Sequence, residues 1–210
     1  ILWPAMLMSA GLQVPKSVYV HPFINSDGQK MSKSLGNVIN PFEIIEKYGV
    51  DPVRYFLLRY IPSNNDGDFN NDRFEEAYNA DLANNLGNLV SRTAAMLVKY
   101  NDGQFDEVKV NSQTQLEDYI SHCQFDKYLE EVFAHLDSLN GAIEENKPWE
   151  LAKSDLSKAI EFLSGLACEL TMMAEYLVPF MPDTSEKILM TFAHGKVNTE
   201  VGILFPRIDS

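Results

Sequence analysis

Hydrophobic and polar positions follow several different patterns in the first 40 residues. Residues 1–8 are apolar throughout and Gly11 follows them, which predicts a short helix that ends before a glycine. Residues 17–24 alternate and are rich in β-branched side chains, which predicts a strand. The cluster at 25–28 predicts a turn, and residues 29–37 read as a polar loop.

Two helices are expected next, each preceded by a polar residue and a proline. Asn40–Pro41 predicts an N-cap with proline at the first helical position, for a helix that runs to about Tyr48. Asp51–Pro52 has the same form and predicts an N-cap for a second helix, which runs to about Tyr60. The first 60 residues are therefore expected to be mixed α/β.

Beyond a polar loop at 61–72, the spacing of apolar residues is helical almost throughout. An irregular connector is expected over 101–112. Helices are expected over residues 74–100, 113–121, 124–146, 155–178 and 183–193. The predicted fold class is mostly α. It consists of a partial α/β region over residues 1–65, followed by an all-α helical bundle over 66–210.

The helix expected over 74–100 has one apolar face and one polar face. The apolar face predicts a stripe directed at the core, made of Leu82, Leu86, Leu89, Val90, Thr93 and Leu97. On the polar face, Asn88 and Arg92 are spaced i, i+4 and are therefore neighbours.

Composition narrows the class of protein. The 210 residues are 45% hydrophobic and 22% charged, as in an ordinary globular protein, and no apolar run is long enough to span a bilayer. Cys123 and Cys168 are the only cysteines, which excludes a disulfide framework and fits a reducing, cytoplasmic location. The net charge of −13 argues against a protein that coats DNA or RNA indiscriminately. The charge is uneven, because residues 1–60 carry a net +2 and residues 61–210 carry −15.

The most informative segment of the positive region is the loop Lys30-Met31-Ser32-Lys33-Ser34. Two lysines three residues apart, on a loop with serine hydroxyls, form a mobile pair of cations. Such a pair suits a polyphosphate whose charge grows in a transition state. A loop can also close on a substrate and open for release. From residue types alone, a solvated surface turn is the competing interpretation.

These five residues match the KMSKS signature in full and resemble class I aminoacyl-tRNA synthetases. The flanking segments resemble the methionyl-tRNA synthetase family in particular, at residues 3–7, 21, 51–59 and 66–69. The resemblance covers essentially the whole chain. It implies that the complete enzyme activates methionine with ATP and transfers it to tRNA(Met). Related enzymes for Val, Leu, Ile and Cys share the lysine loop.

In that family the loop closes over ATP, which is used with Mg²⁺ as a co-substrate. The resemblance implies that Lys33 is catalytic and stabilises the transition state at the α-phosphate and the departing pyrophosphate. It implies that Lys30 is a secondary phosphate contact and that Met31, Ser32 and Ser34 complete the ATP-binding loop. No metal site is expected, because the four histidines and two cysteines lack ligand spacing.

A second candidate site lies in the expected bundle. Amide and guanidinium groups, such as those of Asn88 and Arg92, bond to base edges. Trp149 follows Pro148 at a helix start, and a tryptophan ring can stack on an unpaired base. A solvated helix face and a core tryptophan explain the same pattern. The resemblance implies that Asn88, Arg92 and Trp149 read the CAU anticodon of tRNA(Met).

The chain begins with an apolar run and no capping residue, so we expect a segment of a longer protein. The family's HIGH signature, the first half of its nucleotide-binding fold and most of its methionine pocket have no counterpart in these residues, so the segment alone is not expected to be active. The expected partners are tRNA(Met), ATP and methionine, with no DNA and no membrane. Three alternatives stay open: a class I synthetase for Val, Leu, Ile or Cys, a non-catalytic tRNA-binding helical module, and a helical interaction domain without an RNA role.

Overall fold

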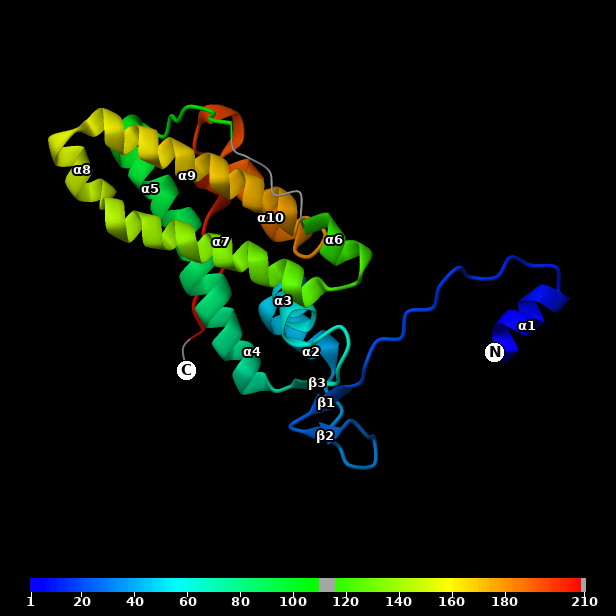
Figure 1. Ribbon diagram of the computed structural model, residues 1–210. Helices are drawn as coiled ribbons and strands as arrows, with labels where there is room; N and C mark the ends of the chain where they lie inside the picture. Colours follow the sequence, from blue (N-terminus) through cyan, green and yellow to red (C-terminus); the bar gives the residue numbers. More distant parts are fainter. Residues whose placement is uncertain (110–115, 209–210) are drawn as a thin grey trace.

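The computed structural model describes residues 1–109 and 116–208 (Figure 1). Most of the described chain is helical, and one small sheet lies at its base. The helices are α1 Leu2–Ser9, α2 Pro41–Tyr48, α3 Val50–Tyr60, α4 Asn71–Ala77, the π-helical η1 Tyr78–Gly87, α5 Asn88–Asn101, α6 Leu116–Ser121, α7 Phe125–Asn146, α8 Pro148–Ser154, α9 Leu156–Leu177, α10 Pro182–Thr191, and the 3-10 turns η2 Ala193–Gly195 and η3 Thr199–Val201. The prediction of a mostly α protein is confirmed.

The N-terminal helix α1 stands apart from the rest of the molecule, and none of its residues is buried (Figure 1). An extended segment joins it to the sheet. The strand predicted over 17–24 is wrong for all but its last residue, because strand β1 covers Ile24–Ser26. Val18 and Val20 are 73% and 79% exposed. Their alternation favours a strand, but residues 17–22 have no partner strand within the described part of the chain.

Three short strands form the sheet, in the order β2–β1–β3. β1 and β2 (Gln29–Lys30) form an antiparallel hairpin, and Gly28 in its turn has a φ of +72°. β3 (Gly67–Phe69) lies parallel to β1, with Gly67 opposite Ile24. The loop predicted over 61–72 thus contains a strand. Three residues that include a glycine and an aspartate carry no β pattern, so the sequence gives no sign of it.

The helix α2 begins and ends where the sequence predicts. The Asn40 Oδ1 atom accepts the N–H of Phe42 at 3.1 Å, and Gly49, with a φ of +88°, follows the last residue. The sequence predicts Asp51 as the N-cap of α3, and this is wrong, because Gly49 occupies that position. Asp51 is buried in the first turn of α3 instead. Its Oδ2 atom accepts the N–H of Thr184 at 2.6 Å, so it caps α10 and not its own helix.

The helix predicted over 74–100 is one continuous helical run through α4, η1 and α5. It begins earlier, because the Asn70 Oδ1 atom accepts the N–H groups of Asp72 and Arg73 at 2.9 and 3.2 Å. In η1 the backbone bonds join residues i and i+5, which shifts the positions that follow around the helix axis. The predicted core stripe is buried in full: Leu82, Leu86, Leu89, Val90, Thr93 and Leu97.

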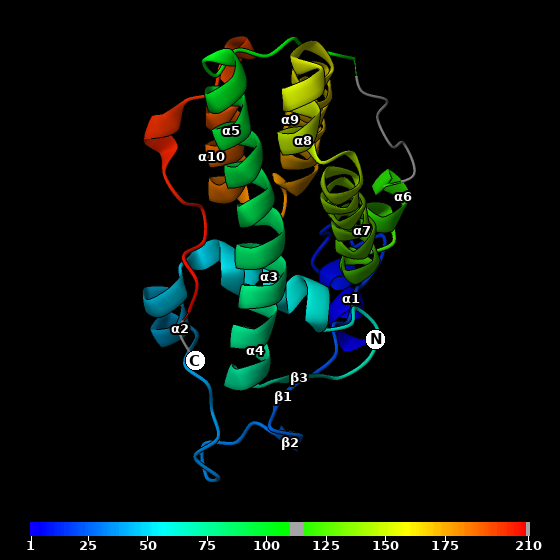
Figure 2. The ribbon, with the colours of Figure 1, turned by 90° about the vertical axis from the view of Figure 1, so that its left-hand side faces the viewer.

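The helices α5, α7, α9 and α10 pack around the larger of two apolar cores, and α8 joins α7 to α9 (Figure 2). The helices predicted over 124–146, 155–178 and 183–193 are confirmed by α7, α9 and α10. Of the helix predicted over 113–121, residues 116–121 form α6, and residues 110–115 lie outside the described part of the chain. The centre of this core is made by fully buried leucines, Leu86, Leu129, Leu136, Leu163 and Leu170.

The helix α3 holds both sides of the break between α9 and α10. The Arg54 Nε and Nη2 atoms donate to the carbonyls of Phe180 and Pro179, each at 2.7 Å. Asp51, one turn earlier on α3, accepts the Thr184 N–H of α10. A cation therefore lies at the C-terminal end of α9 and a carboxylate at the N-terminal end of α10, where each complements the helix dipole.

The same helix, α3, contributes to both cores. Its Tyr55 is 1% exposed and belongs to the larger core, and its hydroxyl donates to Asp81 Oδ2 on η1 at 2.7 Å. The smaller core joins α2, α3, β3 and α4 through Ile44, Val53, Phe56, Phe69, Phe74 and Ala77. The elements next to the lysine loop, α2 and β3, are thus connected to the bundle through packed side chains of α3.

Candidate functional site

The lysine loop begins at the last residue of β2 and leads to α2, at the base of the molecule (Figure 2). Asn37 closes the loop on itself, because its Oδ1 atom accepts the Ser32 N–H at 2.8 Å and its Nδ2 atom donates to the Lys30 carbonyl at 3.2 Å. The Ser32 and Ser34 hydroxyls are 2.7 Å apart, and the Leu35 N–H donates to the Ser32 carbonyl at 3.1 Å. The serines therefore shape the loop. The sequence singles out the lysines and serines but not Asn37.

The two lysines of the loop differ in their surroundings. Lys33 is exposed and makes no hydrogen bond or ion pair with any residue that the structure describes. The Lys30 ammonium lies over the ring of Phe23, 4.5 Å from its centroid. Met31 is half-buried. The Lys33 ammonium is therefore available to an anion that arrives from solvent, and Lys30 is held at the base of the loop.

The hairpin that carries the loop is held by two carboxylates, one just before β3 and one within it. The Asp66 Oδ1 atom accepts the Phe23 N–H at 2.9 Å, and the Asp68 Oδ1 atom accepts the Gly28 N–H at 2.6 Å. Asn70 donates to the carboxylate of Asp27 in the hairpin turn. In the sequence, residues 66–69 serve only as a mark of resemblance, and only the fold shows what their side chains contact.

The helix that follows the loop is tied to α4 by a polar cluster. Glu75 accepts the Tyr48 hydroxyl and pairs with the Lys47 ammonium at 3.1 Å. The hydrogen bond from Tyr48 lowers the pKa of the Glu75 carboxyl, and burial raises the pKa of Tyr48. The cluster joins the C-terminal end of α2 to α4.

The second candidate site brings together residues from three helices of the bundle. The guanidinium carbon of Arg92 on α5 lies 5.7 Å from the ring centroid of Trp149 on α8. Its Nη2 atom donates to Glu144 Oε1 on α7 at 2.9 Å. Asn88 lies one helical turn before Arg92 and is exposed, with no hydrogen bond to any described residue. The sequence gives no signal for Glu144, which reads as part of a solvated acidic face.

Trp149 has features of a core residue and also of a surface on which a base can stack. It is half-buried and packs against the larger core. The rest of the side chain is accessible beside Arg92. A ring that is anchored on one side and open on the other is rigid, which is the property that a stacking surface for a base needs.

Other asparagines of the same helical run are used by the protein itself. The Asn85 amide donates to Asp137 on α7 at 2.7 Å. The Asn84 Oδ1 atom accepts from Arg207 Nε, in the C-terminal segment, at 2.6 Å. Unlike Asn84 and Asn85, Asn88 makes no side-chain hydrogen bond with any residue that the structure describes.

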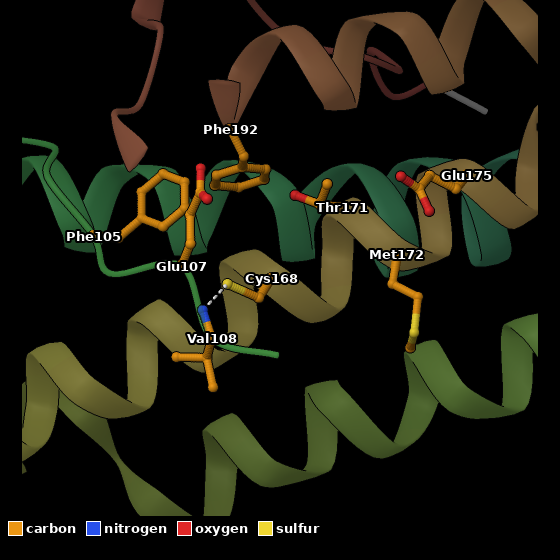
Figure 3. Close-up of a pocket in the computed structure, with 8 residues that line it drawn as sticks. All are labelled: Phe105, Glu107, Val108, Cys168, Thr171, Met172, Glu175 and Phe192. Atoms are coloured by element: carbon orange, nitrogen blue, oxygen red, sulfur yellow. Dashed lines mark hydrogen bonds between the residues drawn. The ribbon is translucent and has the colours of Figure 1, made fainter. Parts of the chain in front are cut away.

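A cavity of about 400 Å³ lies between α9 and the segment that follows α5, away from both candidate sites (Figure 3). There the Val108 N–H donates to Cys168 Sγ at 3.2 Å. Cys123 and Cys168 are both free of disulfide bonds.

Within residues 1–109 and 116–208, no cluster of His, Cys, Asp and Glu could hold a metal ion. In the same residues, every helix is too short or too polar to cross a membrane.

Comparison with known proteins first defines the class. Residues 1–94 match the family described as tRNA synthetases class I (M). These residues include the hairpin, the lysine loop, α2 and α3, so the KMSKS signature stands in the fold context of a class I aminoacyl-tRNA synthetase.

Relatives over the whole chain define the family. Methionine–tRNA ligases from Caldanaerobacter subterraneus subsp. tengcongensis and Clostridium acetobutylicum are each 39% identical over all of this chain, which spans 38% and 37% of their lengths. The crystal structure of Mycobacterium tuberculosis methionyl-tRNA synthetase bound by methionyl-adenylate is similar, with a TM-score of 0.86 and 28% identity over 98% of this chain and 47% of that one. The chain belongs to the methionyl-tRNA synthetase family.

Proposed function

We propose that this chain is the part of a methionine–tRNA ligase that supplies the KMSKS loop and reads the CAU anticodon. The complete ligase activates methionine with ATP and transfers it to tRNA(Met). The observation that carries the proposal is the 39% identity to methionine–tRNA ligases over the whole chain. The chain spans about 38% of the length of these relatives, so the activity is that of the longer protein.

The proposed layout has two parts. Residues 1–65 form the C-terminal end of the catalytic domain, with the lysine loop and the connecting helices. Residues 66–210 form an all-α anticodon-binding bundle. The match of residues 1–94 to the class I family supports the first part. The two free cysteines fit work in the reducing cytoplasm.

In the proposed mechanism, Lys33 supplies a mobile positive charge. When methionine attacks ATP, negative charge grows on the α-phosphate and the departing pyrophosphate. An ammonium group that reaches this charge only as the loop closes stabilises the transition state more than bound ATP. The exposed, unpaired state of Lys33 supports this role, because no ion pair within the described residues has to break before the loop moves.

The remaining residues of the loop have supporting roles. Lys30 contacts the phosphates from a fixed position over Phe23, while Ser32, Ser34 and Met31 give the ATP-binding loop its shape. Mg²⁺ enters with ATP as part of the co-substrate.

The proposed anticodon reader consists of Asn88, Arg92 and Trp149. The tryptophan ring stacks on a base of the opened CAU loop, and the amide and guanidinium bond to base edges. Glu144 holds Arg92 beside the ring in the absence of RNA. Because recognition of this kind depends on stacking and base edges, it is compatible with a bundle that carries a large negative charge.

The catalytic part of the proposal is tested by ATP–pyrophosphate exchange in the full-length ligase. Lys33→Ala is expected to lower kcat by about 10²–10³-fold, with a smaller change in KM for ATP, because a transition-state contact is lost. Lys16→Ala is the matched control, since Lys16 is exposed on the extended segment before the sheet. Unchanged exchange in Lys33→Ala would favour a non-catalytic tRNA-binding module.

A further inference from the structure

The hairpin that carries the lysine loop is too small to fix its own position. β1 and β2 are paired through only two residue pairs, Asn25 with Lys30 and Ser26 with Gln29. An isolated two-stranded hairpin is marginal in water even when it is longer than this. Lys30 is both the last paired residue and the first residue of the loop, so a shift of the hairpin also shifts the start of the loop.

The strand β3, with the carboxylates of Asp66 and Asp68, holds the hairpin in place. Asp66 directly precedes β3 and Asp68 lies within it. Asp66 accepts the N–H of Phe23 at 2.9 Å, just before β1, and Asp68 accepts the N–H of Gly28 at 2.6 Å, in the hairpin turn. The two bonds therefore hold the hairpin at both ends of β1.

The two residues whose N–H groups are bonded, Phe23 and Gly28, are each close to the lysine loop. Phe23, whose N–H is held by Asp66, carries the ring beneath the Lys30 ammonium. Gly28, held by Asp68, sets the turn from which β2 starts. Asn37 then connects Lys30 to the rest of the loop, because its side chain bonds to the Lys30 carbonyl and to the Ser32 N–H.

We propose that Asp66 and Asp68 are positioning residues for the KMSKS loop, which fix the place from which Lys30 and Lys33 act. The inference rests on the proposed function, since it concerns the same loop. Neither carboxylate contacts a lysine of the loop in the described structure, so each acts through the backbone of the hairpin. A carboxylate forms a shorter and stronger bond to a backbone N–H than a neutral acceptor does, which suits an anchor beside a mobile loop.

Gly67, between the two aspartates, also helps to place β3 beside the hairpin. Gly67 is buried, and its N–H donates to the Phe23 carbonyl at 3.0 Å. A Cβ atom at this position would lie 2.7 Å from two side-chain carbons of Ile61. A glycine at position 67 therefore lets β3 pack against Ile61 while its N–H is bonded to the Phe23 carbonyl.

The test compares four variants of the full-length ligase: Asp68→Ala, Asp66→Ala, Asp68→Asn and the control Asp72→Ala. Asp72 is exposed at the start of α4, so its change removes the same charge nearby without touching the hairpin. Each alanine variant at 66 or 68 is expected to lower kcat of ATP–pyrophosphate exchange on the order of 10- to 100-fold, as for a misplaced catalytic group. Asp68→Asn keeps an acceptor oxygen and is expected to recover most of the rate.

Two further measurements separate positioning from loss of fold and from failure of the proposed function. In the 210-residue chain, hydrogen exchange at the Gly28 amide is expected to be faster in Asp68→Ala and near wild type in Asp68→Asn, while the far-UV circular dichroism of the helices is unchanged. If Asp68→Ala keeps the wild-type rate of ATP–pyrophosphate exchange while Lys33→Ala loses most of it, the inference is overturned and the proposed function stands. If Lys33→Ala also keeps the wild-type rate of ATP–pyrophosphate exchange, both are overturned.

Discussion

The contact between Asp51 and α10 gives a stability prediction that depends on the fold and not on the function. Asp51→Ala removes the acceptor of the Thr184 N–H at the start of α10 and leaves that N–H buried without a partner. Loss of a helix cap costs about 0.5–2 kcal/mol, and loss of a hydrogen bond to a charged group costs about 1.5–3 kcal/mol.

The net effect lies near the overlap of these two ranges and below the upper limit for a hydrogen bond to a charged group. The second carboxylate oxygen of Asp51, Oδ1, is buried with no hydrogen-bond partner among the described residues, and its desolvation opposes the gain from the bond to Thr184. We therefore expect Asp51→Ala to lower the free energy of unfolding by about 2 kcal/mol and Tm by about 4–8 °C. Asp51→Asn keeps an acceptor and is expected to lose less.

The assay is urea unfolding of the 210-residue chain, followed by far-UV circular dichroism. Asp183→Ala is the matched control, because Asp183 is an exposed acidic residue in the first turn of α10 itself and its loss costs about 0.3–1 kcal/mol. If Asp51→Ala loses no more stability than Asp183→Ala, α3 does not hold α10 in the way that the structure indicates.

Two further predictions concern the sheet and the bundle. Gly67→Ala is expected to lower the free energy of unfolding by about 1–3 kcal/mol, because its Cβ would lie 2.7 Å from side-chain carbons of Ile61, and unchanged urea unfolding would contradict this. Burial raises the pKa of Tyr128 to about 12 from its ordinary value near 10. The unfolded chain therefore ionises first, and the stability that this residue contributes is present below pH 10 and is lost as the pH rises toward 12. Urea unfolding between these pH values is expected to show a flatter decline for Tyr128→Phe than for the wild type, and equal slopes would refute the cause given.

Much of the helical structure could be predicted from the sequence because its signals are local. Asn40 and the proline after it define the start of α2 through one side-chain bond within the same turn. The long apolar stripes of α7 and α9 need only the helical period to be seen. The core stripe of the 74–100 helix was also predictable, since η1 keeps the chain helical and every predicted core residue is buried.

The errors have a common cause, which is contact between distant parts of the chain. Asp51 has the sequence context of a local N-cap, but its partner Thr184 is 133 positions away. The predicted strand at 17–24 fails because a strand needs a neighbour, and residues 17–22 have none within the described part of the chain. The strand that does form, β1, starts at Ile24 and pairs with β2 and with β3, which lies in a segment predicted to be a polar loop. The roles of Asp66 and Asp68 could not be predicted for the same reason, since their bonds join residues 43 and 40 positions apart.

The candidate sites were predictable to different degrees. Lys33 could be singled out because the five-residue signature is contiguous. Arg92 and Trp149 were joined by resemblance only, and the fold brings them to 5.7 Å of each other from two helices. Glu144, which holds Arg92, could not be distinguished from the other acidic residues on the surface of α7.

The most direct test of the central claim is binding of the 210-residue chain to an anticodon hairpin. A hairpin with a CAU loop is compared with single-base variants at one fixed, moderate salt concentration, for the wild type and Trp149→Ala. The proposed reader predicts a preference for CAU of about 1–3 kcal/mol per changed base, and its loss in Trp149→Ala. Equal binding to all hairpins by the folded chain would contradict anticodon reading by Asn88, Arg92 and Trp149.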